Sequence, residues 1–196
     1  MARDEIILGG FGGQGIILAG YIMGKGASLF DKKYATHIQD YGPEARGGAC
    51  RTEVVISDSK ISYPYIDNPS VLAVMSQEAY TKYSPGMRQG TVLLIDEDLV
   101  KPKKSKHAGF FAVPATRIAQ ELGRVAVANV VMLGFITAVT NVVSVDAMKK
   151  AVLESVPKGT EELNTKAFDR GYSYGLEKLK TAKERGNESW DAGNRW

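Results

Sequence analysis

A glycine-rich segment directly after an apolar run is the feature that most restricts how this chain can fold. Residues 5–9 contain three consecutive aliphatic side chains, and glycines occupy positions 9, 10, 12, 13 and 15. Such a run is typical of a buried parallel strand, and glycines permit the tight turn that leads into a helix. The segment therefore predicts a strand, a glycine loop and a helix over residues 14–30. Because Gly20 and Gly24 are poor helix formers, another backbone is expected to pack closely against them.

The rest of the chain alternates between strand-like and helix-like patterns and then becomes helical. Further apolar strand-like runs lie at residues 33–38, 52–57, 71–75, 91–95 and 110–113. After residue 125 the pattern is helical, with an apolar helix at 127–139 and a last helix at 163–182. These patterns predict a three-layer α/β/α sandwich with a mainly parallel sheet and a helical C-terminal part. Residues 1–182 are expected to form a single domain, and residues 183–196 a tail that is loose or bound to a partner chain.

The glycine loop has the spacing of a phosphate-binding turn. Gly10, Gly12 and Gly15 form a G-x-G-x-x-G pattern between a strand and a helix, whose first N–H groups can attract a phosphate. The alternative is a turn whose glycines serve packing alone. Dinucleotide binding is disfavoured because it requires an acidic residue at the end of the second strand, whereas Asp31 precedes that strand and Asp40 follows it.

Composition narrows the chemistry further. The single cysteine, Cys50, can form no internal disulfide and cannot hold an iron–sulfur cluster alone, since a cluster takes about four such ligands. We expect a buried thiol there rather than a nucleophile, although His37 could act as its base. His37 and His107 lack metal-ligand spacing, so no metal site is expected. A net charge of +3 favours neither nucleic acid nor a membrane surface, and the absence of a secretory signal predicts a cytoplasmic protein.

A second loop, at residues 41–48, has the sequence Tyr-Gly-Pro-Glu-Ala-Arg-Gly-Gly. Pro43 fixes one φ angle and the two final glycines permit an unusual backbone path. Together with the Gly-Phe-Gly-Gly-Gln-Gly segment at residues 10–15, this loop resembles the gamma subunit family of 2-oxoacid:ferredoxin oxidoreductases, which includes pyruvate, ketoisovalerate and 2-oxoglutarate enzymes. The resemblance covers residues 4–180 and extends to Asn68-Pro69, residues 71–80, and residues 127–133 with Asn129.

The resemblance implies a non-autonomous enzyme subunit. Its holoenzyme would decarboxylate a 2-oxoacid on thiamine diphosphate, pass electrons to ferredoxin through iron–sulfur clusters and transfer the acyl group to CoA. Alpha, beta and delta chains would hold the thiamine diphosphate, magnesium and clusters, and the gamma chain would contribute no catalytic residue. The free-standing length resembles gamma chains of the 2-oxoglutarate or related 2-oxoacid enzymes. A free-standing nucleotide- or CoA-binding Rossmann-like module is the alternative.

Within such a complex the two loops have different expected functions. The glycine loop either contacts the phosphates of CoA or serves the fold alone. The candidate CoA contacts are Gly10, Gly12, Gly13, Gln14 and Gly15. The second loop is expected at an interface with partner subunits, because arginine and tyrosine side chains are common at interface centres. The candidate interface residues are Tyr41, Gly42, Glu44, Arg46, Gly47 and Gly48.

Overall fold

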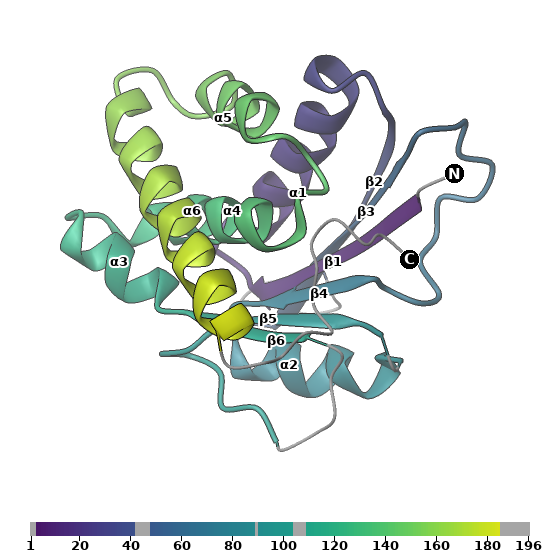
Figure 1. Ribbon diagram of the computed structural model, residues 1–196, viewed down its shortest axis with the longest axis horizontal. Coiled ribbons are helices and arrows are strands. Elements are labelled where there is room, and N and C mark those ends of the chain that lie inside the picture. Colours follow the sequence, from purple (N-terminus) through teal and green to yellow (C-terminus); the bar gives the residue numbers. More distant parts are fainter. Residues whose placement is uncertain (1–2, 42–47, 89, 104–108, 185–196) are drawn as a thin grey trace.

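The described strands form one mixed sheet. A computed structural model describes residues 3–41, 48–88, 90–103 and 109–184. Within these residues the strand order is β2-β3-β1-β4-β5-β6 (Figure 1). The strands are β1 (Arg3–Phe11), β2 (Tyr34–Asp40), β3 (Ala49–Ser57), β4 (Val71–Val74), β5 (Val92–Asp96) and β6 (Gly109–Val113). β1, β4, β5 and β6 run parallel, whereas β3 is antiparallel to both β1 and β2, so the prediction of a mainly parallel sheet is confirmed.

Helices cover both faces of the sheet unequally. Five helices lie on one face, and α2 lies on the other (Figure 1). The helices are α1 (Ile16–Lys25), α2 (Gln77–Tyr83), α3 (Ala115–Glu121), α4 (Ala128–Thr140), α5 (Val145–Leu153) and α6 (Glu161–Glu184), with a π-helical turn, η1 (Gly26–Phe30), after α1. The three-layer prediction is confirmed, with one thick helical layer and one thin one. In the described part of the chain, no helix combines the length and apolarity needed to cross a bilayer.

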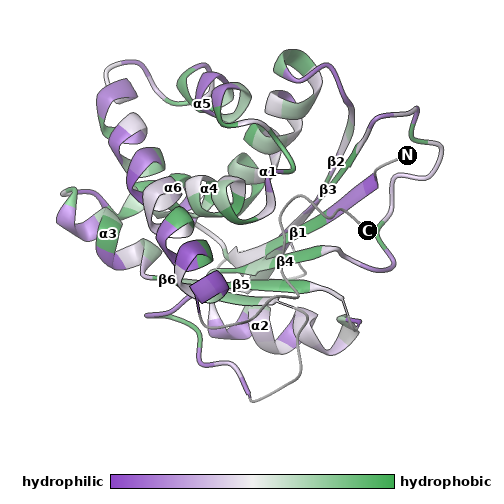
Figure 2. Ribbon diagram, in the orientation of Figure 1, coloured by the Kyte–Doolittle hydropathy of each residue, from purple (hydrophilic) through white to green (hydrophobic). Residues whose placement is uncertain are grey.

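The thick layer is built around α4. Every residue of this helix is buried, because α1, α3, α5 and α6 pack around it and its side chains join the core above the sheet. Figure 2 shows the resulting pattern: α4 and the central strands are mainly hydrophobic, whereas α6 carries hydrophilic residues as well. Phe135 of α4 and Phe168 of α6 are among the largest fully buried side chains.

Close helix packing occurs at other glycines than the sequence suggested. A Cβ atom added at Gly20 would lie 2.5 Å from the side chain of Thr52, so a close approach does occur there, but by side chains rather than by another backbone. At Gly24 the nearest atoms would be 4.0 Å away, so the prediction is wrong there. The closest backbone contacts lie between α4 and α6, where a Cβ at Gly134 or Gly171 would overlap the main chain of the other helix.

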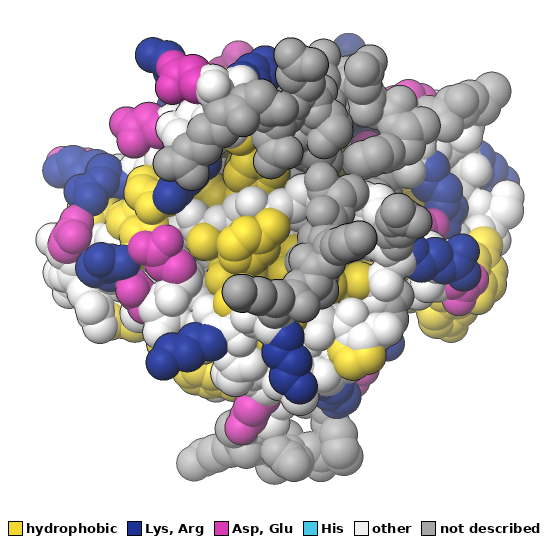
Figure 3. Space-filling view, turned by 60° about the horizontal axis from the view of Figure 1, so that its bottom comes forward, with side chains coloured by type: hydrophobic (Ala, Val, Ile, Leu, Met, Phe, Trp, Pro, Cys, Tyr) yellow, Lys and Arg dark blue, Asp and Glu magenta, His cyan; other side chains and the backbone are white. Residues whose placement is uncertain are grey.

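The thin layer covers a second, smaller core. Ile7, Leu72 and Leu93 of the sheet pack there against Ala79 and Tyr80 of α2. Figure 3 shows the molecule from this side: hydrophobic side chains gather near the middle of the face, and charged side chains lie around them. Of the described α-helices, only α2 covers this side of the sheet.

Candidate functional site

The structure places the start of the glycine loop next to the described end of the second motif. Phe11, the last residue of β1, pairs with Ala49, the first residue of β3. Gly48, the last residue of the second motif, directly precedes Ala49, so it comes next to the point where the glycine loop leaves β1. Of the second loop, Tyr41 is exposed and Gly48 is half-buried, while the remaining predicted interface residues lie outside the described part of the chain: Gly42, Glu44, Arg46 and Gly47.

Gln14 fixes the glycine loop from within. Its side-chain oxygen accepts a hydrogen bond from the backbone N–H of Phe11 at 2.9 Å, and its side-chain nitrogen donates to the carbonyl of Met75 at 2.7 Å. A Cβ at Gly10 would lie 2.5 Å from the Gln14 amide oxygen, so a glycine is required beneath this side chain. Gln14 thus joins the turn to the end of β4 and uses its polar groups inside the protein.

Asn129, at the start of α4, holds the loop from the opposite side. Its side-chain nitrogen donates to the carbonyl of Gly15 at 3.1 Å, and its oxygen accepts from the N–H of Val130 at 2.9 Å. Gly15 has φ +70°, and a Cβ there would overlap the Asn129 amide. The resemblance singled out Asn129 as a motif residue, but its contact with the loop bridges 114 residues and has no local signal.

The tip of the loop remains open. Gly12 and Gly13 are exposed, and Gly13 has φ +103° with no atom near the position of a Cβ. α1 begins without a side-chain cap and without an acidic residue in its first turn, so its first N–H groups can receive an anion. α1 and α2 follow neighbouring parallel strands on opposite faces of the sheet, and ligands of open α/β sheets bind at such a switch point.

A charged cluster lies at the end of β2 and the start of β3, on the α2 side. The guanidinium of Arg51 lies 3.0 Å from the carboxylate of Glu53, 3.4 Å from that of Asp40 and 5.4 Å from the centre of the Tyr83 ring. The Tyr83 hydroxyl donates to the carbonyl of Ala49 at 3.2 Å. Burial and the nearby Asp40 carboxylate raise the pKa of Tyr83, so its hydroxyl keeps its proton. The cluster anchors both strands that flank the loop.

Cys50 lies beside the loop but faces the core. It is buried, and burial raises the pKa of its thiol, so the protonated form prevails at neutral pH. His37 pairs with Val54, four residues along β3 from Cys50, which places the two about 13 Å apart along the strand. His37 therefore cannot serve as its base, and the expectation of a buried thiol is confirmed.

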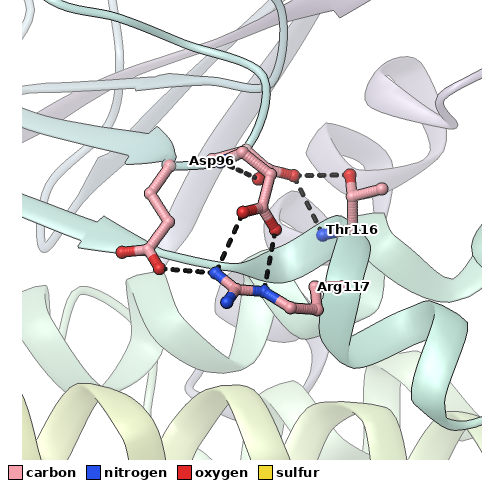
Figure 4. A network of polar contacts seen from close by, with 5 residues as sticks. Asp96, Thr116 and Arg117 are labelled. Carbon is pink, nitrogen blue, oxygen red and sulfur yellow. Dashed lines mark hydrogen bonds and ion pairs between the residues drawn. The ribbon is translucent and has the colours of Figure 1, made fainter.

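The acidic end of β5 stabilises the fold. Asp96 is fully buried, and one of its oxygens accepts hydrogen bonds from the Thr116 N–H at 3.0 Å and hydroxyl at 2.6 Å (Figure 4). Its other oxygen accepts from the N–H of Asp98 at 3.2 Å. Arg117 binds the carboxylates of Glu97 and Asp98 at 2.8 and 2.9 Å. Asp96 therefore caps the start of α3. Throughout the described residues, no group of three or more metal-ligating side chains converges.

Comparison with known proteins identifies a family model and relatives that this chain resembles. Residues 5–174 match the family model described as pyruvate ferredoxin/flavodoxin oxidoreductase. The 2-oxoglutarate synthase subunit KorC of Methanocaldococcus jannaschii is 52% identical over 178 residues, which cover 89% of this chain and 95% of the relative.

Two solved structures share the fold. The gamma subunit of a keto/oxoacid ferredoxin oxidoreductase from Geobacter sulfurreducens is 43% identical, with a TM-score of 0.82 over 90% of this chain and 98% of that one. A 2-oxoglutarate:ferredoxin oxidoreductase from Magnetococcus marinus is 23% identical, with a TM-score of 0.78 over 90% of this chain and 32% of that one. The second likeness shows that the same fold also occurs within a longer chain.

Proposed function

The chain belongs to the pyruvate ferredoxin/flavodoxin oxidoreductase family as a gamma-type subunit of a multi-subunit 2-oxoacid:ferredoxin oxidoreductase, and from that premise we propose that its complex acts on 2-oxoglutarate. The similarity to a 2-oxoglutarate synthase subunit over nearly the whole length of both chains carries this proposal. The complex would convert 2-oxoglutarate and CoA to an acyl-CoA and carbon dioxide, with the electrons passing to ferredoxin. A free-standing nucleotide-binding module is not supported.

The division of work within the complex is the one that the family resemblance implies: alpha, beta and delta subunits would hold thiamine diphosphate, magnesium and the iron–sulfur clusters. The single cysteine of this chain agrees with the clusters lying in other subunits, because one cysteine cannot ligate a cluster by itself. This chain would contribute to the complex at the end of the sheet where β1 stops and β3 begins. We place the second loop, with its exposed Tyr41, against a partner subunit in a cytoplasmic complex.

The glycine loop divides into a structural part and a ligand-binding part. Gln14 and Gly15 are held by internal contacts, with Gly10 packed beneath the Gln14 side chain. Gly12 and Gly13 are exposed next to the uncapped start of α1, and these two glycines would contact the phosphates of CoA.

Substrate preference tests the proposed reaction. The complex, assembled with all its subunits, would be assayed for CoA-dependent ferredoxin reduction with 2-oxoglutarate, pyruvate and 2-oxoisovalerate in turn. The highest kcat/KM is expected with 2-oxoglutarate. A higher value with pyruvate or 2-oxoisovalerate would reject 2-oxoglutarate while leaving the subunit assignment in place.

A substitution at the exposed loop tip tests the CoA contact. Gly12→Val adds bulk at an exposed position, so the complex should assemble normally and show an increased KM for CoA. The KM for 2-oxoglutarate is the internal control and should stay unchanged. Normal assembly with an unaltered KM for CoA would restrict the glycine loop to a structural role.

A further inference from the structure

The edge strand β2 is unprotected, which natural proteins usually avoid because an open strand can pair with another chain. β2 pairs with β3 on one side, and no described strand pairs with its other side. It is seven residues long and contains no proline, lysine or arginine, the features that commonly protect an edge. The opposite edge strand, β6, has five residues, and α6 packs against it. The two edges therefore differ, and β2 is the one suited to further strand pairing.

Exposed apolar side chains lie next to this open edge. Leu18 and Tyr21 of α1 and Leu29 of η1 are 39%, 49% and 63% exposed. Tyr21 and Leu29 also line a hollow of about 260 Å³ together with Ala35 and His37 of β2. We refer to β2 with Leu18, Tyr21 and Leu29 as the β2 surface. Such a contiguous apolar surface beside an unpaired strand is typical of an interface.

The charges on and beside β2 favour pairing with an identical strand in the antiparallel direction. Residues 34–39 contain no acidic, lysine or arginine side chain, so the strand can lie beside an identical strand without repulsion. The exposed Lys32 precedes the strand, and Asp40, which also lies 3.4 Å from the Arg51 guanidinium, ends it. An antiparallel pair of two β2 strands would place the lysine end of each beside the aspartate end of the other, whereas a parallel pair would bring like charges together. Lys25, which borders the hollow, is already paired with Glu154 at 3.0 Å.

We propose that a second copy of this chain docks on the β2 surface, with the two β2 strands antiparallel about a two-fold axis. The contact joins the two sheets into one continuous sheet along about 23 Å of strand. Since α1 lies beside β2 on the thick side of the sheet, the same rotation brings the apolar stripes of the two α1 helices together. The 2-oxoacid oxidoreductase complex would then contain two gamma-type chains in direct contact.

Light scattering on the full-length chain tests this contact. The wild-type protein is expected at twice the 21.3 kDa of one chain. Leu29→Asp should shift it to the mass of one chain, because it places a carboxylate in the apolar part of the contact. Leu176→Asp is the matched control, since Leu176 is 47% exposed on α6 and lies outside the β2 surface, and this variant should stay dimeric. Circular dichroism would show that both variants are folded.

Hydrogen exchange gives an independent readout. Amides of residues 34–40 should exchange more slowly as the protein concentration rises, and Leu29→Asp should abolish this dependence. A wild-type chain that stays monomeric at high concentration, or a dimer that Leu29→Asp leaves intact, would overturn the proposal. Both outcomes are independent of substrate preference, so the proposed reaction could stand if the dimer fails.

Discussion

At the scale of single residues, two amide side chains determine the shape of the glycine loop. Gln14 joins the loop to the end of β4, and Asn129 joins it to the start of α4. Each side chain uses both its donor and its acceptor within the protein. The loop is therefore held in place before any ligand or partner arrives, and its exposed tip can be positioned accurately.

Replacing Gln14 tests this internal support. Gln14→Ala leaves the N–H of Phe11 and the carbonyl of Met75 without their partner, so a loss of about 1–3 kcal/mol in the free energy of unfolding is expected. Gln120→Ala, at an exposed position on α3, should change stability by less than about 0.5 kcal/mol. Urea denaturation of the isolated chain measures both. Equal effects of the two substitutions would show that the bridge contributes nothing.

The buried carboxyl of Asp96 should make stability depend on pH. Burial raises the pKa of Asp96 against the opposing hydrogen bonds from Thr116, so the folded protein binds this proton more tightly than the unfolded chain. Its contribution to stability is therefore complete below about pH 3.9, the pKa of an unperturbed aspartate. It decreases as the pH rises through the raised pKa of the folded state. The stability advantage of wild type over Asp96→Asn should be larger at about pH 4 than at neutral pH. A larger advantage at neutral pH would mean a lowered pKa instead.

Some of these residue roles were visible in the sequence and others were not. The loop glycines and the buried Cys50 could be predicted because a turn and a lone apolar thiol have local signals. The contact of Asn129 with Gly15 could not, because it joins residues 114 positions apart. The cap formed by Asp96 also depends on where α3 begins in space, which the acidic run alone does not reveal.

At the scale of elements, the crossing of α4 and α6 is the tightest feature of the described fold. Gly134 and Gly171 face each other's helix, and a side chain at either position would overlap the opposite backbone. Periodicity predicted both helices, but it could not tell which glycines lie at a crossing, since this depends on the angle between the helices. The antiparallel pairing of β2 and β3 likewise could not be read from the apolar pattern of either strand alone.

A pair of identical substitutions tests this packing. Gly171→Ala should destabilise the protein by about 1–3 kcal/mol, because the main chain of α4 must move away. Gly24→Ala should stabilise it by about 0.5–1 kcal/mol, because the site has room and alanine favours the helix. Thermal unfolding of both variants provides the measurement. A stabilising Gly171→Ala would contradict the close crossing of the two helices.

At the scale of the whole molecule, the fold holds the glycine loop beside the start of β3, at the end of the sheet where β1 stops. The thick helical layer holds this end of the sheet from one side, and α2, with the Arg51 cluster, holds it from the other. The layer order could be predicted because alternating strands and helices leave few architectures. The position of the glycine loop beside the start of β3 could not, because it depends on β3 lying next to β1.

The complex is expected to need this subunit for activity, and the subunit is expected to be inactive on its own. The most direct measurement is 2-oxoglutarate- and CoA-dependent ferredoxin reduction by the isolated chain, by the complex assembled without it, and by that complex after the purified chain is added back. We predict no turnover from the isolated chain, strongly reduced turnover from the incomplete complex and recovery on addition. Turnover by the chain alone, or full activity in its absence, would contradict the account.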